Sequence, residues 1–272
     1  MSGGDRSARV ADLDFSQVSR IDALSPGRFM WQVPDGWQQG RGAYGGLVLA
    51  ALLRAMEAME PDRGRVTRSL TGDLCGPVQP GPAELVVEVL RRGNNLSNLD
   101  ARLIQGGEVQ ARASAVLSAA KAGAQLPAPL RPPEAPPFDS LRELLLGPPD
   151  APVFTPHFEY RSAGPAPFDP GPGGPLGWLR LRRPPARLDA PALLALLDAW
   201  WPAIFDGRPR PMATVSFTAE ILVAPAELDP AAPLLYTGRV AGLHEGFCVE
   251  FRELWQGDRP VALNQQTFAI LR

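Results

Sequence analysis

The hexapeptide "SLTGDL", Ser69 to Leu74, recurs later in the chain as "SFTAEI", Ser216 to Ile221, with identical or similar residues at all six positions. Because six residues can match by chance, the surroundings of the two hexamers decide what the match means. Each hexamer is preceded by one strongly apolar segment. Each is followed by a proline, Pro77 or Pro225, and then by three extended segments. The pattern predicts an internal repeat.

The apolar segment before each hexamer is predicted to be a buried helix, because a helix that is apolar on nearly every side belongs inside a protein. The first runs near Leu47 to Met59, behind the glycine pair of "GAYGGLVLAALLRAME". The second is "LDAPALLALLDAWWPAIFDG". Asp189 is its expected N-cap and Pro191 lies in its first turn, while Gly207 and Pro209 are expected to close it.

The three segments after each hexamer are predicted to be antiparallel strands. They read "AELVVEVLRRG", "LSNLDARLIQGG" and "EVQARASAVLSA" in the first repeat, and "PLLYTGRVAG", "GFCVEFRELWQGD" and "PVALNQQTFAILR" in the second. The turn signals "QGG" and "QGD" fall at matching places and favour hairpins. A helix followed by a strand meander, occurring twice, predicts an α+β tandem (double) hotdog. Each half would be an antiparallel sheet wrapped round a central apolar helix, with the two sheets joined edge to edge.

A proline-rich bridge separates the two repeats. Of the 31 prolines in the chain, 15 fall between Pro127 and Pro175. Such a stretch cannot continue a helix or an inner strand. The predicted organisation is therefore an N-terminal repeat over residues 1–120, a linker over 121–176 and a C-terminal repeat over 177–272.

Composition narrows the classes of partner and location. A net charge of −2 gives no basic surplus for nucleic acid, and 45% hydrophobic residues suffice for a core. The polar N-terminus lacks the apolar region of a secretory signal, and no apolar stretch approaches the ~20 residues of a membrane span. We expect a cytoplasmic protein without nucleic-acid partner or membrane span. The cysteines and histidines (Cys75, Cys248, His157, His244) fit no zinc or redox spacing, so no metal is expected.

Four segments carry a resemblance to a known family: "YGGLVLAALLRA", "LLALLDAWWPAIF", "ATVSFTAEIL" and "VALNQQTFAILR". From about Phe29 to Arg272 the sequence resembles the double-hotdog acyl-CoA thioesterases of the bacterial thioesterase II type. The resemblance implies hydrolysis of acyl-CoA thioesters to free acid and CoA in lipid metabolism. It implies no separate cofactor, because coenzyme A is part of the substrate. A homodimer of double-hotdog chains is a further expectation.

The glycine pair has two interpretations. Gly45 and Gly46 would let the helix start close against a neighbouring strand. Alternatively, their N–H groups, unpaired in the first helical turn, would stabilise the negative charge that develops on a thioester oxygen. The resemblance favours the second interpretation, with Gly46 polarising the carbonyl and with Tyr44 and Gly45 contacting substrate.

The resemblance also implies a water-positioning trio that this sequence fills incompletely. Ser216 stands in "ATVSFTAEIL" where the family usually carries an aspartate. The glutamine of the trio matches Gln266, with Gln265 as the one-residue-shift alternative, and the threonine or serine member falls near Arg239 to Leu243 without an assignable residue. The period of a strand places Thr218 on the same face as Ser216, so this face is expected to border the site and Thr218 to contact substrate.

Asp198 is the remaining candidate acid, because a carboxylate flanked by leucines and tryptophans is costly without a partner. The "LLDAW" segment resembles single-hotdog thioesterases of the phenylacetate-pathway type, which use an aspartate here together with the glycine-led helix of the partner subunit. The first helix has the glycines but Leu53 or Arg54 at the acid position, whereas the second has only the acid. This predicts one site per chain, in which Asp198 activates water or attacks, assisted by Ser216 and Gln266. The alternative is an aspartate that only anchors neighbouring backbone.

Two other functions fit parts of the pattern. The serine at position 216 suggests a non-catalytic acyl-CoA-binding protein. A hotdog hydratase would need a paired aspartate and histidine, for which His157 in the linker and His244 in a predicted turn offer no obvious site.

Overall fold

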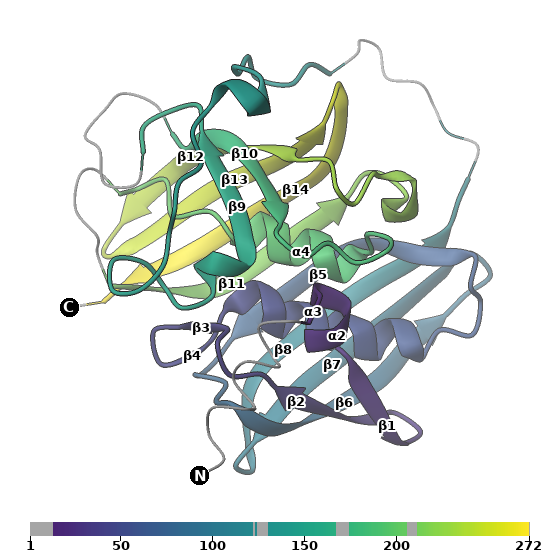
Figure 1. Cartoon of the computed structure of the whole chain (residues 1–272). Helices are drawn as coiled ribbons and strands as arrows, with labels where there is room; N and C mark the ends of the chain where they lie inside the picture. The colour runs from purple at the N-terminus through teal and green to yellow at the C-terminus, as the bar shows by residue number, and fades with distance from the viewer. Residues whose placement is uncertain (1–12, 122, 124–129, 167–173, 206–210, 272) are drawn as a thin grey trace.

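The computed structural model describes residues 13–121, 123, 130–166, 174–205 and 211–271 (Figure 1). The first half comprises α2 (Phe15–Val18), β1 (Ile21–Ser25), β2 (Arg28–Val33), β3 (Gln38–Gln39), β4 (Gly42–Ala43), α3 (Gly45–Ala58), β5 (Arg65–Leu74), β6 (Gly81–Arg92), β7 (Leu96–Gln105) and β8 (Glu108–Ala119). The second comprises β9 (Phe158–Ser162), β10 (Leu176–Leu181), α4 (Ala190–Asp198), β11 (Met212–Ile221), β12 (Leu234–His244), β13 (Phe247–Gln256) and β14 (Arg259–Ile270). Short 3₁₀ turns lie at Phe138–Ser140, Thr155–His157 and Pro225–Glu227.

One sheet runs through both halves. Within the described ranges it has 12 strands in the order β1-β2-β6-β7-β8-β5-β11-β14-β13-β12-β10-β9. The halves join where β5 pairs antiparallel with β11, with Thr71 opposite Thr218 and Ser69 opposite Glu220. Because Thr71 and Thr218 hold the same position in the repeated hexamers, an approximate twofold axis passes between them. The predicted edge-to-edge joining is confirmed, and the hexamers form the seam.

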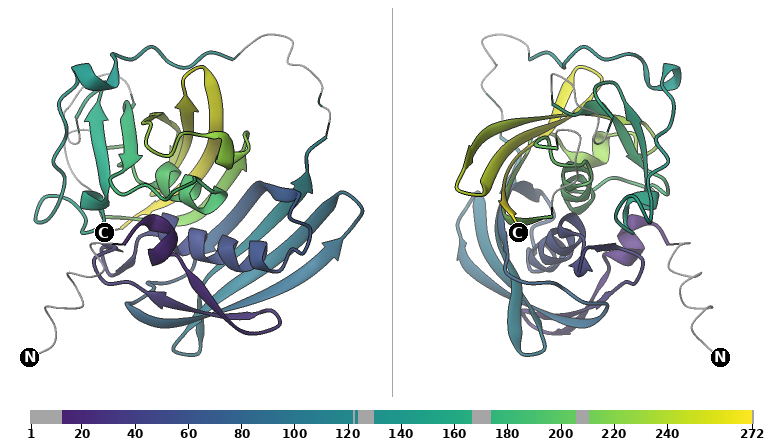
Figure 2. Two further views of the ribbon diagram at one scale, coloured as in Figure 1. Left: turned by 45° about the vertical axis from the view of Figure 1, so that its right-hand side comes forward. Right: turned by 90° about the vertical axis from the view of Figure 1, so that its left-hand side faces the viewer.

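Each half of the sheet curves round one apolar helix, and α3 and α4 pack against each other between the halves (Figures 1 and 2). Every residue of α4 is buried, and in α3 the side chains of Leu47, Leu49 and Leu52 are fully buried. A helix that is apolar all round requires cover on every side, which the sheet and the partner helix provide. The tandem hotdog prediction is thereby confirmed.

Helix α4 begins as expected and ends earlier than expected. The Asp189 side chain accepts a 2.9 Å hydrogen bond from Ala192 N, so it is the N-cap. The helix ends at Asp198, whereas the sequence predicted that it would continue through the tryptophan pair. Pro202 cannot continue a helix, and a buried Arg252 side chain donates to the carbonyl of Leu197 in the last turn. The expected closing residues Gly207 and Pro209 lie outside the described residues.

The C-terminal sheet begins inside the segment predicted to be a linker. Strand β9 (Phe158–Ser162) pairs with β10, so the boundary predicted at residue 176 falls too late. The five residues "FEYRS" contain no proline and can form a strand. The prolines on both sides of them led to the prediction of a linker. As an edge strand, β9 needs ladder bonds on one side only. It occupies the place at its end of the sheet that β1 occupies at the other.

Candidate active site

The carboxylate of Asp198, at the last residue of α4, lies against the first turn of α3. Its Oδ2 accepts a 2.7 Å hydrogen bond from the backbone N–H of Gly46. Its Oδ1 accepts a 2.7 Å hydrogen bond from the Gln266 side-chain amide on β14. Asp198 is 8% exposed and Gln266 is fully buried. The structure therefore brings together three of the predicted site residues, one from the N-terminal repeat and two from the C-terminal repeat.

The glycine pair serves both packing and hydrogen bonding. A Cβ at Gly46 would lie 2.9 Å from Ala195 Cα on α4, so only glycine allows this approach of the two helices. The Gly46 N–H is occupied by Asp198. The N–H of Gly45, the first residue of the helix, donates to no described residue. A Cβ at Gly45 would lie 3.0 Å from Asp198 Oδ2 and 2.8 Å from Leu74 Cδ1. In the first turn of α3, the N–H group without a partner among the described residues is thus that of Gly45.

Tyr44, the residue before α3, is fully buried. Its hydroxyl donates to the carbonyl oxygen of Ala195, and its ring stacks on Phe154 with centroids 4.2 Å apart. Burial first, and then the nearby Asp198 carboxylate, raises the pKa of the phenol well above its ordinary value. The residue therefore stays neutral and helps to fix the start of α3 against α4.

The register of the sheet separates Gln266 from Ser216. Gln266 pairs directly with Phe217 on β11, and directly opposed residues share a face. Ser216 pairs with Thr267 and lies on the opposite, outer face. Thr218 shares that outer face, where its hydroxyl lies 3.3 Å from that of Thr71. The expectation that the face with Ser216 and Thr218 borders the site is wrong, because the neighbouring residues of β11 supply the inner face.

A bulge in β11 brings a threonine to the inner face that the sequence did not identify. The register shifts between Thr214 and Ser216, so Val215 is the extra residue. Thr214 pairs with Phe268, a buried residue two positions beyond Gln266 on the same face of β14. The segment from Arg239 to Leu243, near which the threonine or serine member was expected, contains neither residue type, and all five of its residues are exposed on β12. A bulge cannot be read from period-two alternation, which explains the omission.

Burial dominates the electrostatics of Asp198. Desolvation raises the pKa of the carboxyl above its ordinary value, and the Arg252 guanidinium, the Gln266 amide and the Gly46 N–H oppose the rise. Arg252 Nη1 lies 3.9 Å from Asp198 Oδ1. The Gln266 Oε1 atom is buried without a hydrogen-bond partner among the described residues. The site therefore combines a raised-pKa carboxylate with an adjacent unused acceptor, as a base that holds water requires.

The position related to this site by the approximate twofold axis has different chemistry. At the other end of the helix pair, Arg54 of α3 forms a 2.8 Å ion pair with Asp189, the N-cap of α4. Pro191 stands where the first helix has Gly46, and proline has no N–H to donate. The described residues thus offer the carboxylate and glycine combination at one end only.

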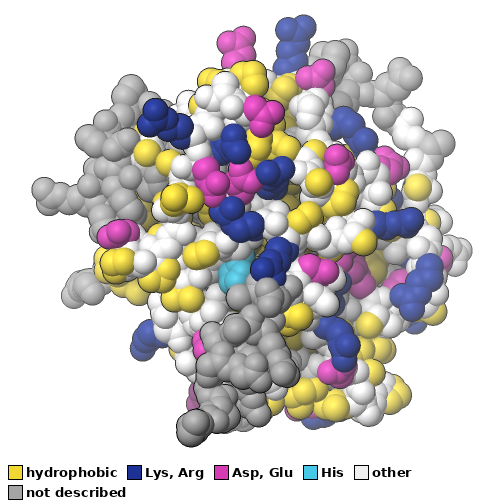
Figure 3. All heavy atoms as spheres, viewed as in Figure 1, with side chains coloured by type: hydrophobic (Ala, Val, Ile, Leu, Met, Phe, Trp, Pro, Cys, Tyr) yellow, Lys and Arg dark blue, Asp and Glu magenta, His cyan; other side chains and the backbone are white. Residues whose placement is uncertain are grey.

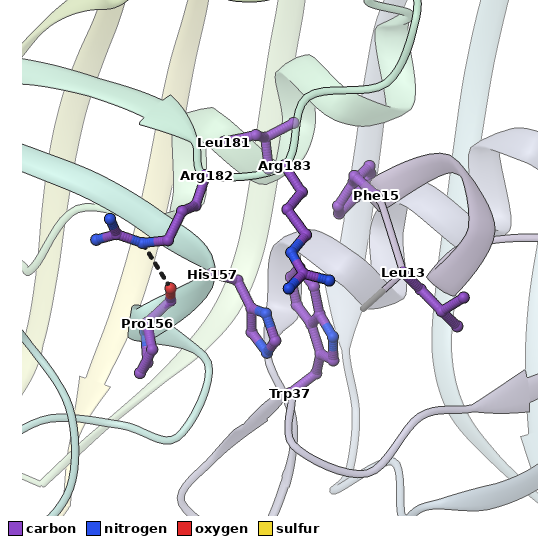
Figure 4. Close-up of a pocket in the computed structure, with 8 residues that line it drawn as sticks. All are labelled: Leu13, Phe15, Trp37, Pro156, His157, Leu181, Arg182 and Arg183. Carbon is purple, nitrogen blue, oxygen red and sulfur yellow. Dashed lines mark hydrogen bonds between the residues drawn. The ribbon is translucent and has the colours of Figure 1, made fainter. Parts of the chain in front are cut away.

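A separate pocket of about 220 Å³ lies between the halves, lined by Leu13, Phe15, Trp37, Pro156, His157, Leu181, Arg182 and Arg183 (Figure 4). His157 stacks on Trp37 with centroids 3.9 Å apart, and its Nε2 lies 2.8 Å from Gly36 O. Burial first lowers the pKa of the imidazole, although the Gly36 contact opposes this. His244 is exposed. Neither histidine bonds to Asp198, so the described residues hold no hydratase-type pair.

Charges of both signs are interspersed over the face seen in Figure 1, as the space-filling view shows (Figure 3). Among the described residues no group of three or more His, Cys, Asp or Glu side chains is arranged to hold a metal ion. In the same ranges no helix combines the length and the apolar character needed to cross a membrane.

Comparison with known proteins adds the family. The model of the acyl-CoA thioesterase N-terminal domain matches residues 33–118, and the model of the acyl-CoA thioesterase C-terminal domain matches residues 127–270. No curated protein has a matching sequence.

Solved structures share the fold at low sequence identity. A conserved hot dog fold protein from Alicyclobacillus acidocaldarius has a TM-score of 0.86 and 23% identity, over 95% of this chain and 98% of that one. A TesB protein from Mycobacterium avium subspecies paratuberculosis has a TM-score of 0.76 and 17% identity, over 95% and 98%. An acyl-CoA thioesterase II from Mycobacterium marinum has a TM-score of 0.74 and 18% identity, over 94% and 98%. With both family models matched in order over most of its length, the chain belongs to the acyl-CoA thioesterase family, the double-hotdog thioester hydrolases of the bacterial thioesterase II type.

Proposed function

We propose that the protein hydrolyses acyl-CoA thioesters to free acid and CoA at a single site per chain, formed by Asp198 and the N-terminus of α3. The observation that carries the proposal is the meeting of a buried carboxylate from one repeat with the glycine-led helix of the other. A helix N-terminus carries partial positive charge and unpaired N–H groups. It therefore suits the oxyanion of an acyl-transfer intermediate.

In the proposed reaction the thioester carbonyl oxygen accepts a hydrogen bond from Gly45 N–H. Asp198 takes a proton from a water molecule as the water oxygen attacks the carbonyl carbon. The negative charge on the tetrahedral intermediate is stabilised at the helix N-terminus. Collapse breaks the carbon–sulfur bond, and the CoA thiolate recovers the proton from Asp198. The reaction balances, since one water and one thioester give one acid and one thiol.

Water activation is favoured over direct attack by Asp198. Both carboxylate oxygens already accept a hydrogen bond, one from Gly46 and one from Gln266, which reduces their nucleophilicity. The free Oε1 of Gln266 belongs to the amide that contacts Asp198, so it supplies a second acceptor for the same water. Thr214 is the hydroxyl residue that the register favours as the third member of this group.

The position of Ser216 no longer favours the alternative of a non-catalytic acyl-CoA-binding protein. That alternative rested on Ser216 in place of an aspartate, but that residue lies on the face of β11 opposite to Gln266. The two functions are separated by thiol release from a panel of acyl-CoAs of different chain length, measured beside acyl-CoA binding. We expect turnover with at least one member. Tight binding without thiol release from any member would overturn the hydrolase.

The expected cytoplasmic location stays a prediction. The second part of the proposal is that two double-hotdog chains form a homodimer. Phe247, Phe251 and Leu263 are exposed on β13 and β14 of the C-terminal sheet, at 51%, 37% and 38%. Exposed apolar side chains gathered on one surface mark interaction sites. Sedimentation velocity should give twice the chain mass of 29.2 kDa for the wild type and a smaller species for Phe251→Glu. A wild type that sediments at the chain mass would contradict the dimer.

A further inference from the structure

An arginine that the proposed reaction does not use directly is buried behind Asp198. Arg252 on β13 is 1% exposed. Its Nη1 donates to the carbonyl oxygens of Leu197 at 3.1 Å and Trp200 at 3.4 Å, and lies 3.9 Å from Asp198 Oδ1. One guanidinium thus holds the end of α4 on both sides of the aspartate.

Arg252 also pairs with a second buried carboxylate. Its Nε and Nη2 donate to Glu250 Oε2 at 3.2 and 3.0 Å, and Glu250 is fully buried. The other Glu250 oxygen accepts a 3.3 Å hydrogen bond from Ile204 N, in the segment that follows α4. Two buried carboxylates therefore share one buried cation. A buried ion pair is a poor way to stabilise a fold, and losing one partner leaves a costly unpaired charge.

We propose that Arg252 is a positioning residue that fixes the end of α4 and keeps Asp198 ionised as the base, an inference that rests on the proposed function. Its planar fork meets two carbonyls and two carboxylates at once, which the single ammonium of lysine cannot reproduce. The C-terminal end of a helix carries partial negative charge, which would otherwise disfavour a carboxylate at this place. Arg252 supplies the compensating positive charge.

The other titratable groups around Asp198 do not supply this charge. Tyr44, Tyr160 on β9 and Tyr236 on β12 interact electrostatically with Asp198, and burial raises the pKa of all three phenols, so they stay neutral. Glu250 acts in the opposite direction to Arg252, because a second negative charge raises the pKa of the Asp198 carboxyl. The protonation of Asp198 is therefore set by burial, by its two hydrogen bonds and by the balance between Arg252 and Glu250.

The test compares Glu250→Gln with the double variant Glu250→Gln/Arg252→Met, because neither leaves an unpaired Glu250 in the interior. The acidic limb of the pH profile of kcat/KM reports the Asp198 carboxyl. In Glu250→Gln the limb should move to lower pH than in the wild type. In the double variant the acidic limb should lie about one pH unit or more above the limb of Glu250→Gln. The value of kcat should fall by a larger factor than the factor by which KM changes. Coincident limbs in the two variants would overturn the proposal.

A matched control uses a second arginine–glutamate pair of the same half. Arg180 on β10 bonds to Glu159 on β9, and the pair has no hydrogen bond to Asp198. Glu159→Gln/Arg180→Met should leave the limb at the wild-type pH. If the acidic limb of this control moves as far as the limb of Glu250→Gln/Arg252→Met, the displacement is a general structural effect, which would contradict the positioning role.

A second readout separates this inference from the proposed function. In the full chain labelled with ¹³C at aspartate carboxyls, the Asp198 resonance is identified by its loss in Asp198→Asn. Its titration is followed without any turnover. If Asp198→Asn keeps wild-type hydrolysis, the proposed mechanism fails while this titration still tests Arg252. A resonance that titrates at the same pH with and without Arg252, in the Glu250→Gln background, would refute the inference.

Discussion

Asp198 Oδ2 lies 2.7 Å from the backbone N of Gly46, across the contact between the two repeats. The bond joins the C-terminal end of α4 to the N-terminal end of α3, so neither repeat contains it alone. In the proposed mechanism the Gly46 N–H orients the base and the neighbouring Gly45 N–H remains for the substrate carbonyl. The two adjacent N–H groups thus have different partners.

Gly46→Ala should destabilise the fold. The added Cβ would lie 2.9 Å from Ala195 Cα, and backbone at this distance cannot move aside cheaply. Overpacking of this kind costs about 1–3 kcal/mol. Urea unfolding measures the loss, with Gly242→Ala as the control, because a Cβ at Gly242 meets nothing within 4 Å. Equal stability of the two variants would contradict the account of the helix contact.

Thr214→Val should lower kcat, because the register places Thr214 on the face of the sheet that carries Gln266. Loss of one hydrogen bond to the attacking water corresponds to about a tenfold decrease. Thr218→Val, on the outer face of the same strand, is the matched control and should retain wild-type kcat. The assignment fails if Thr218→Val is the more impaired of the two variants.

Glu57→Gln should change how stability depends on pH. Burial raises the pKa of the Glu57 carboxyl to about 7. The folded protein therefore binds more protons than the unfolded chain between the ordinary glutamate range and that value, and wild-type stability falls as the pH rises through this window. The amide still accepts the Thr67 hydroxyl bond of 2.6 Å but does not titrate.

Above the window, near about pH 8, the Glu57→Gln variant should be more stable than the wild type by about 1–2 kcal/mol. Near about pH 4 the two proteins should be nearly equal, because the wild-type carboxyl is then protonated. Urea unfolding at a series of pH values measures the difference. If the free energies of unfolding of the two proteins differ by the same amount from acid to neutral pH, the prediction is refuted.

The repeat, the two helices and the strand meanders were predictable because their signals are local. Apolar runs, an N-cap at Asp189 and turn dipeptides act over a few residues. The two hexamers also revealed the seam, since Thr71 and Thr218 pair directly. Strand β9 was not predicted because its five residues lie in a proline-rich segment, and proline disfavours strands.

The inner face of the site was less predictable because it depends on register. Around residue 250 the chain buries Cys248, Glu250, Arg252 and Leu254 and leaves Phe247 and Phe251 exposed. Hydrophobicity alone predicts the reverse arrangement for Phe251 and Arg252. The available signal was the spacing of Glu250 and Arg252, opposite charges two residues apart and therefore on one face. Asp198 was predictable from the cost of its apolar surroundings.

The most direct test of the central claim is the single-turnover and steady-state rate of thiol release by Asp198→Asn on an acyl-CoA that the wild type hydrolyses. The variant should fold and bind substrate with kcat lower by about 10²–10⁴-fold, the range that a positioned general base contributes. Ser216→Ala, on the outer face of β11, should keep wild-type kcat. A folded Asp198→Asn variant with wild-type turnover would contradict the claim that this carboxylate activates water.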